Sequence, residues 1–469
     1  MNITRRTACQ TLLAASLAAQ QPRPLRKPNL VVILADDLGY GDIACFGGTE
    51  VSTPEIDSLT ASGTKFTDGY VSCAVCSPSR ASLLTGRYQQ RFGHEFNPHS
   101  EKWEAEAGFG LSPKEKILPQ YLKAFGYKSG IVGKWHLGSQ PGFHPLDRGF
   151  DEFYGFLGGA NDYATLETRD ARGLRGEEGD EIPQVRRHPI LRGKQEVREP
   201  RYLTDAFMEE SCAFIDRYRQ QPFFLFLALN AVHNPLHATE RYWNRFAGVK
   251  NERRRILAAM AAAMDDATGA VLRKIRECGL ERDTLVVFLS DNGSPLMNGA
   301  GSNGVFNGAK CTYYEGGIRI PFLAAWPGRI PAGKVYRHPV TSRDILPTFL
   351  AAAGASPPAD VPFDGVDLLP FLNGARTQPP HDVLHWRAGK GRAARMGKWK
   401  LVECGDRHSK LYDLSADPGE TRDLSAEFPA VHQQLRQAWN GWNSRMMPPR
   451  WPARQRKIAI NGEQLVWDL

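Results

Sequence analysis

The sequence predicts an α/β fold in which helices flank a large central sheet of mostly parallel strands. Short apolar runs bounded by turn residues have the length and composition of buried strands. These runs are 29–35, 129–133, 223–230, 284–290 and 322–326. Helical patterns separate the runs at 79–87, 205–220 and 256–278, and this alternation is typical of parallel strands joined by crossover helices.

Polar side chains follow two of the predicted strands. Asp36 and Asp37 come directly after the first run, and Asp291 and Asn292 follow the run 284–290. The carboxyl ends of parallel strands are where α/β sheets bind ligands. Carboxylate and amide oxygens suit a hard cation such as calcium or magnesium, so we expect a metal site at this edge of the sheet.

Cys76 is a candidate functional residue in the segment Cys-Ser-Pro-Ser-Arg at 76–80. Pro78 favours the start of a helix, which places Arg80 in its first turns, facing the same cavity as residue 76. A helix N-terminus and a planar guanidinium both attract oxyanions. A thiolate, however, suits zinc, copper or iron better than a hard cation. Either Cys76 takes no part in the metal site or it does not remain a cysteine.

Six motifs along the chain bear on this question. In order they are Ala-Asp-Asp-Leu-Gly-Tyr-Gly-Asp at 35–42, the stretch 76–87, Gly-Lys-Trp-His-Leu-Gly at 133–138, Ala-Val-His-Asn-Pro at 231–235, Ser-Asp-Asn-Gly at 290–293, and Lys310 ahead of Tyr-Glu-Gly-Gly-Ile-Arg-Ile-Pro at 314–321. Their content and order resemble the type I sulfatases, members of the alkaline-phosphatase-like superfamily. The resemblance extends from about residue 28 into the 410s.

The resemblance implies that a formylglycine-generating enzyme oxidises Cys76 to formylglycine, whose hydrated aldehyde supplies hard oxygens. It also implies that Asp36, Asp37, Asp291 and Asn292 bind the metal together with that side chain. The metal of the family is mostly calcium, and the sequence leaves magnesium open. The implied fold has a mixed, mostly parallel central sheet and a small C-terminal antiparallel sheet.

The resemblance assigns catalytic roles to five basic residues. Arg80 orients the modified side chain, and Lys134 helps to bind the sulfate and stabilise the nucleophile. His136 takes a proton from the hydrated aldehyde and so expels sulfate, a task that suits imidazole because its pKa lies near neutrality. His233 and Lys310 bind sulfate oxygens and assist the departing alcohol. The predicted reaction is hydrolysis of a sulfate monoester, with a sulfated carbohydrate as the expected substrate.

Two other functions remain open at this point. A phosphonate or phosphate ester hydrolase of the same superfamily would share these motifs, and an inactive sulfated-glycan-binding protein would share the fold. The formal charge of +8 fits a polyanionic partner, or simply a solvated basic surface, and no nucleic-acid-binding motif is present. His94, His99 and His237 are further candidates for substrate contact, with ordinary packing as the alternative.

Residues 1–19 predict a signal peptide. Arg5 and Arg6 precede a short run rich in small apolar residues, with Ser-Leu-Ala at 16–18 as the cleavage site, and the arginine pair also suggests a twin-arginine signal. Its removal lowers the formal charge to 8 − 2 = +6. We therefore expect an exported protein, periplasmic or secreted. No later segment has about 20 uninterrupted apolar residues, so no integral membrane span is expected.

Composition and local patterns predict how the rest of the chain is divided into domains and loops. We expect a catalytic domain at 28–355, an antiparallel-sheet subdomain at 380–445 and a tail at 446–469 that no pattern places. The short strands expected in the subdomain are 383–386, 399–403 and 410–414. The charge-dense segment 169–201 predicts an exposed loop near the mouth of the site. The eight cysteines show no zinc spacing, and one or two disulfides remain open.

Overall fold

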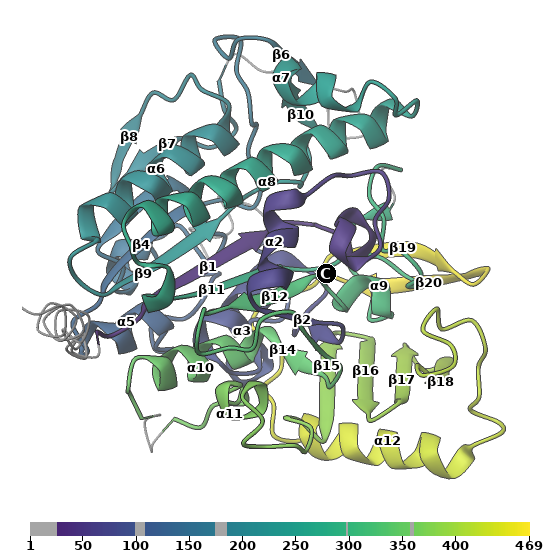
Figure 1. Ribbon diagram of the computed structural model, residues 1–469. Helices are drawn as coiled ribbons and strands as arrows, with labels where there is room; N and C mark the ends of the chain where they lie inside the picture. The colour runs from purple at the N-terminus through teal and green to yellow at the C-terminus, as the bar shows by residue number, and fades with distance from the viewer. Residues whose placement is uncertain (1–25, 99–107, 174–184, 297–298, 357–360) are drawn as a thin grey trace, which may run out of the picture.

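The computed structural model describes residues 26–98, 108–173, 185–296, 299–356 and 361–469. The predicted signal peptide and His99 lie outside these residues. A ten-stranded sheet forms the centre (Figure 1). Its strands in chain order are β1 (Asn29–Ala35), β2 (Thr64–Phe66), β4 (Lys128–Lys134), β5 (Glu152–Phe156), β7 (Ile190–Arg192), β8 (Gln195–Val197), β9 (Phe223–Ala228), β11 (Thr284–Ser290), β12 (Phe322–Ala325) and β13 (Lys334–Tyr336).

The order of strands across the sheet is β13-β2-β12-β11-β1-β9-β4-β5-β7-β8. The pairs β11-β1, β1-β9, β9-β4, β4-β5 and β13-β2 are parallel. The other four neighbouring pairs, which lie toward the two edges, are antiparallel. The predicted mixed, mostly parallel α/β sheet is therefore confirmed, and the five predicted strands are all present, with ends within two residues of those expected.

Strand β1 lies in the middle of the sheet and is apolar on both faces. Leu30 and Val32 pack into one hydrophobic core, and Val31 and Ile33 pack into the core on the opposite face. All four side chains are fully buried, because helices cover both faces of the sheet. This is why the strand appears in the sequence as a continuous apolar run instead of an alternating one.

The helices form one layer on each face of the sheet (Figure 1). Helices α2 (Pro54–Ser62), α6 (Leu203–Tyr218) and α8 (Glu252–Glu277) pack on one face. Helices α3 (Cys76–Thr85), α5 (Leu118–Lys123) and α10 (Ile345–Ala352) pack on the other. The three helices predicted from the sequence correspond to α3, α6 and α8, although α3 begins three residues earlier than expected, at Cys76.

A smaller antiparallel sheet follows in the chain, as predicted. Its strands are β15 (Val383–Ala388), β16 (Gly391–Met396), β17 (Trp399–Cys404) and β18 (His408–Asp413), of which β16 was not predicted. Trp386, Val402 and Tyr412 join the core that also holds α3 and α10. Helix α12 (Pro429–Asn443) covers the opposite face with Leu435 and Trp439.

Two segments differ from the sequence prediction. The segment 169–201 is not simply an exposed loop, because its described part forms β6 (Ala171–Gly173) and supplies the edge strands β7 and β8 of the main sheet. The tail that no pattern placed forms a hairpin of β19 (Gln455–Ile460) and β20 (Glu463–Asp468). The seven cysteines in the described part are all free thiols. Among the described helices, none is long and apolar enough to cross a membrane.

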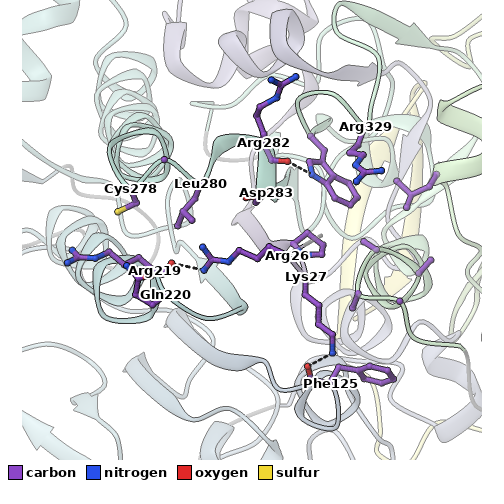
Figure 2. Close-up of a pocket in the computed structure, with 18 of the residues that line it drawn as sticks. Arg26, Lys27, Phe125, Arg219, Gln220, Cys278, Leu280, Arg282, Asp283 and Arg329 are labelled. Carbon is purple, nitrogen blue, oxygen red and sulfur yellow. Dashed lines mark hydrogen bonds between the residues drawn. The ribbon is translucent and has the colours of Figure 1, made fainter. Parts of the chain in front are cut away.

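A cavity of about 1330 Å³ lies at the amino ends of the parallel strands. Figure 2 shows Arg26, Lys27, Arg219, Arg282 and Arg329 among its lining residues. None of the predicted site residues lines it. They gather instead at the carboxyl ends of the strands, which is the edge where α/β sheets bind ligands.

Candidate active site

Four neighbouring strands deliver polar residues to one place at the carboxyl edge of the sheet. Asp36 follows β1 directly, and Asp291 follows β11 directly. The two strands pair in parallel with Ala35 opposite Ser290, which sets these acids side by side. Strand β4 ends at Lys134, and His233 lies in the short loop after β9. The sheet register therefore creates the cluster that the sequence predicted.

Cys76 is the first residue of α3 and faces this cluster. Its side chain is buried, with an exposed fraction of 1%, and its Sγ lies 3.5 Å from Asp36 Oδ1. Burial raises the pKa of the Cys76 thiol above its ordinary value, although Lys134 lowers it in part. The unmodified side chain is therefore a neutral thiol in a site dominated by carboxylates and ammonium groups, and it contributes neither a thiolate nor an oxygen.

Arg80 lies one turn further along α3 and ties three elements together. Its Nε and Nη2 each lie 2.9 Å from Asp291 Oδ2, and its Nη1 donates to the main-chain carbonyl of Lys134 at 3.0 Å. The guanidinium is fully buried. A planar fork with several fixed donors can hold this geometry, whereas a lysine ammonium could not. Arg80 thus fixes the start of α3 against the ends of β11 and β4.

Two lysines contact the aspartates after β1. Lys134 Nζ lies 2.5 Å from Asp36 Oδ2, and Lys310 Nζ lies 2.7 Å from Asp37 Oδ1. Burial alone would raise the pKa of the Asp36 carboxyl, but the neighbouring Lys134, His233 and Arg80 hold it below its ordinary value. Burial opposes the charge of Lys310, yet Asp37 raises its pKa well above the ordinary value. The site therefore contains ionised acids and ammonium groups in close contact.

The donor atoms at this edge fit a hard divalent cation. Ligand atoms of Asp36, Asp37, Cys76 and His233 all lie within 4.8 Å of one another. Asn292 Nδ2 donates to Asp37 Oδ1 at 2.7 Å, while its Oδ1 is buried and has no hydrogen-bond partner in the described chain. A buried carbonyl oxygen without a donor is costly, and a bound cation would satisfy it.

The remaining predicted ligand, Asp291, borders this group. Its Oδ1 accepts a hydrogen bond from the main-chain N–H of Asp37 at 3.3 Å, and its Oδ2 faces Arg80. Burial and the neighbouring Asp36 carboxylate raise the pKa of Asp291 to about 6. The sequence expectation differs from the geometry in one respect, because His233, which it assigned to catalysis, lies within the metal-capable group as well.

The two histidines face the site in different ways. His136 is buried, and burial followed by the charge of Lys134 lowers its pKa well below the ordinary value, so the ring is neutral at neutral pH. The Nδ1–H of His233 donates to the carbonyl of Asn234 at 2.6 Å, which leaves Nε2 facing Asp37 Oδ2 at 3.6 Å. A neutral ring can accept a proton, and a fixed tautomer defines which nitrogen is available.

Left-handed backbone conformations occur at the site. Asp37 has φ of 62°, His136 has φ of 59° and Cys311 has φ of 81°. The backbone therefore turns at His136 and does not continue the extended conformation of β4. Non-glycine residues in this region cost about 1–3 kcal/mol each and persist where surrounding structure enforces them, commonly at functional sites.

A cavity of about 500 Å³ opens onto the cluster. Cys76, His136, His233 and Lys310 line it, whereas Arg80 and Lys134 are not among its lining residues and lie behind the exposed surface of the site. The lining also includes four residues that sequence reasoning missed, namely Arg187, His188, Arg454 and Arg456. They come from the predicted loop and from the unplaced tail, and no local motif marks them.

The weaker histidine candidates have structural surroundings. His94 is fully buried, with its Nε2 2.7 Å from Ser77 Oγ and its ring 4.9 Å from that of Trp451. Burial lowers the pKa of His94 to about 3, so it packs as a neutral ring. His237 is fully buried in the short strand β10 (His237–Thr239) and does not line the cavity.

Comparison with known proteins agrees with this fold. A family model described as Sulfatase matches residues 28–355, and one described as N-sulphoglucosamine sulphohydrolase, C-terminal, matches residues 301–441. The chain therefore belongs to the sulfatase family, the enzymes that hydrolyse sulfate esters.

Individual relatives cover most of the chain. N-acetylgalactosamine-6-sulfatase of Canis lupus familiaris is 37% identical over 406 residues, which span 83% of this chain and 74% of the relative. Arylsulfatase A of Homo sapiens is 34% identical over 470 residues, spanning 91% and 88%. The crystal structure of Ps i-CgsB in complex with k-i-k-neocarrahexaose has a TM-score of 0.82 at 34% identity, covering 91% of this chain and 95% of that one.

Proposed function

We propose that this protein is an exported sulfatase that removes sulfate from a sulfated carbohydrate, using a formylglycine made from Cys76 beside a bound calcium ion. The observation that carries the proposal is the position of Cys76. Its side chain lies 3.5 Å from Asp36 and lines the cavity together with His136, His233 and Lys310. A buried neutral thiol is a poor ligand for a hard cation, whereas a hydrated aldehyde at the same place would offer oxygens.

The metal would be held by Asp36, Asp37, Asp291 and Asn292, with the modified side chain at position 76. Bound calcium would polarise the attacking oxygen and offset the charge of the sulfate ester. Two observations support this assignment: Asn292 Oδ1 has no hydrogen-bond partner among the described residues, and the donor set is rich in oxygen. Magnesium remains the alternative ion, and it demands a tighter octahedral geometry than calcium does.

The basic residues divide into two groups in the proposed reaction. Lys310 and His233 line the cavity and contact Asp37, so they can bind sulfate oxygens and stabilise the departing alcohol. His136 also lines the cavity, and its neutral ring can accept the proton whose removal releases sulfate. Arg80 and Lys134 stand behind these groups and hold residue 76 and Asp36 in place.

Relatives and charge support the proposed substrate class. The solved structure of Ps i-CgsB contains a neocarrahexaose, and N-acetylgalactosamine-6-sulfatase is named for a sulfated amino sugar. A cavity of about 500 Å³ falls within the usual size of small-ligand sites. The formal charge of +8, or 8 − 2 = +6 after removal of the predicted signal, also suits a polyanionic saccharide. Export through the predicted signal at 1–19 completes the proposal, and cell fractionation tests it.

The test is release of free sulfate from a panel of sulfated saccharides, with the protein co-produced with a formylglycine-generating enzyme and supplied with calcium. Wild type and the control Cys212→Ala, which removes a half-buried cysteine of α6, should release sulfate, and Cys76→Ala should not. If the aldehyde is present at position 76 and no saccharide loses sulfate, phosphate and phosphonate esters become the better candidates. Retention of a glycan without any release would favour a binding protein.

A further inference from the structure

The cavity above Cys76 carries more positive charge than one sulfate group requires. Within the described part of the chain no acidic side chain lines it, whereas Arg187, Arg454 and Arg456 do, in addition to Lys310 and the histidines of the proposed reaction. Lys310 is engaged with Asp37. The three guanidiniums therefore belong to the cavity without a role in the proposed chemistry.

Arg454 and Arg456 are held in place by the C-terminal hairpin. Arg456 lies in β19, and Arg454 directly precedes that strand, where its main chain exchanges two hydrogen bonds with Leu469 and so continues the pairing of the hairpin. The two arginines are two residues apart, so their side chains project from the same face. The same face continues as Ile458 and Ile460, which are buried in the main hydrophobic core. Opposite Arg456 in the register stands Trp467, which is fully buried. The hairpin thus packs with one face on the main domain, and that face reaches the cavity as two arginines.

The hairpin packs beside the loop that carries Lys310. The ring of Trp467 lies 6.2 Å from that of Tyr313, three residues after Lys310. Asp468 Oδ2 accepts a hydrogen bond from the main-chain N–H of Lys390 at 2.8 Å, and Cys404 Sγ lies 3.2 Å from the carbonyl oxygen of Val466. Contacts to both the loop of Lys310 and the smaller sheet make the hairpin a rigid support for Arg454 and Arg456.

A different segment of the chain supplies Arg187 and His188 to the same cavity. The ring of His188 stacks on that of Phe156 at 6.2 Å and 11°. A Cβ added at Gly158 would meet the His188 ring at 2.3 Å, and one added at Gly159 would meet His136 Nε2 at 2.6 Å. The two glycines therefore allow both imidazoles to lie against one stretch of backbone. Arg187 lies 3.4 Å from Asp162, so part of its charge is offset.

We propose that Arg454 and Arg456, together with Arg187 and His188, form a second anion subsite next to the position of the scissile sulfate. The preferred substrate is then a sulfated saccharide with a further anionic group, either a second sulfate or a uronate carboxylate. This inference rests on the proposed sulfatase function and specifies its substrate. Planar guanidiniums suit both anions because they donate two parallel hydrogen bonds to a pair of oxygens.

The test compares three disaccharides that share one scissile sulfate: one with no other charge, one with a second sulfate and one with a uronate. The wild type should show a higher kcat/KM for the doubly charged substrates, mainly through KM. The double variant Arg454→Ala/Arg456→Ala should lower the ratio of kcat/KM for doubly over singly charged substrates by about tenfold, the loss typical of charge-assisted hydrogen bonds. Arg456→Lys should retain part of the preference.

Lys457→Ala is the matched control. Lys457 is exposed, adjacent to Arg456 in the same strand and on the opposite face, and it does not line the cavity. This variant should keep the wild-type ratio, which separates a local subsite from the general basic charge of the surface. Comparison of the two doubly charged disaccharides distinguishes a subsite that prefers sulfate from one that prefers carboxylate.

A binding measurement distinguishes an incorrect subsite assignment from an incorrect sulfatase assignment. Titration calorimetry of the disulfated disaccharide into Cys76→Ala protein requires no turnover, and the added arginine substitutions should weaken this binding about tenfold. Such weakening supports the subsite even if no sulfate is released from any substrate. Equal kcat/KM for all three substrates, or equal binding with and without the two arginines, would overturn the proposal.

Discussion

The Cys76 thiol lies 3.5 Å from the Asp36 carboxylate, where the first residue of α3 meets the end of β1. This contact places the residue that the sulfatase signature marks inside a cluster of buried acids and ammonium groups. Arg80 holds the same helix to Asp291, so the position of residue 76 is fixed from both strands. A residue held in this way can meet a bound metal and a substrate without rearrangement of the backbone.

Removal of the metal should lower thermal stability as well as activity. The buried carboxylates of Asp36, Asp37 and Asp291 are close together, and Asn292 Oδ1 has no hydrogen-bond partner in the described chain. Calcium at about 100 times its Kd should stabilise the fold by about 2.7 kcal/mol. Differential scanning fluorimetry with calcium and after chelation measures this shift. Asn292→Ala should reduce it, whereas the exposed Asn440→Ala should leave it intact. An unchanged melting temperature in calcium would contradict the metal assignment.

The two cavity histidines should affect different stages of turnover. With 4-nitrophenyl sulfate, His136→Ala should release about one equivalent of nitrophenol per active site and then stall, because the proposed base for release of sulfate is absent. His233→Ala should instead slow the first release of nitrophenol, because the proposed role of His233 is to assist the departing group. Stopped-flow absorbance follows the first turnover, and ion chromatography follows sulfate. Identical behaviour of the two variants would refute the separate roles.

Lys400 should contribute stability that depends on pH. Its Nζ lies 2.7 Å from Glu315 in α9 (Glu315–Ile318) and 2.7 Å from Glu420, and all three side chains are fully buried. Replacement by methionine removes the lysine from both buried carboxylates and leaves Glu315 with Arg319 as its cation, at 3.1 Å. The free energy of unfolding at pH 7 should therefore fall by about 3–5 kcal/mol. Lys398→Met is the control, because its ion pair with Asp413 is half exposed and worth at most about 1 kcal/mol.

The pH dependence follows from the pKa of each acid. Burial would raise the pKa of Glu315, but Lys400 lowers it to about 2, so this contribution is present above the ordinary value of 4.5 and is lost as the pH falls toward 2. Burial raises the pKa of Glu420 to about 7, so its contribution is largest below 4.5 and declines as the pH rises toward 7. The deficit of Lys400→Met should shrink as the pH falls from 7 to 3, measured by urea unfolding. A deficit that grows on acidification would contradict this account.

The bounds predicted from the sequence were most accurate for strands that are buried on both faces of the sheet. Strands β1 and β11 match their predicted bounds, because their interiors at 30–35 and 285–289 are continuously apolar and acids follow directly at Asp36 and Asp291. The acids at these ends could be grouped from the sequence, since parallel neighbours end at one edge of the sheet. The geometry of His136 could not, because its ring lies against Gly159 and its main-chain N–H donates to the Leu157 carbonyl at 3.0 Å, contacts that are distant in sequence.

The local sequences of β16 and of the C-terminal hairpin did not predict these elements. Strand β16 contains glycine and two arginines, and it is a strand because β15 and β17 pair with it on either side. Strand β19 begins with three polar residues and β20 with two, so neither strand shows a clear alternation of polar and apolar residues. Only the tertiary packing of Ile458 and Trp467 brings Arg454 and Arg456 to the cavity. Such long-range contacts cannot be inferred from local propensity.

The most direct test of the account relates activity to the chemical state of residue 76. Preparations made with graded amounts of a formylglycine-generating enzyme can be digested with trypsin, and mass spectrometry of the peptide 66–80 gives the fraction of chains with an aldehyde at that position. The account predicts that the rate of sulfate release is proportional to this fraction and falls by about a thousandfold or more in Cys76→Ala. Full activity in a preparation whose residue 76 is an unmodified cysteine would contradict it.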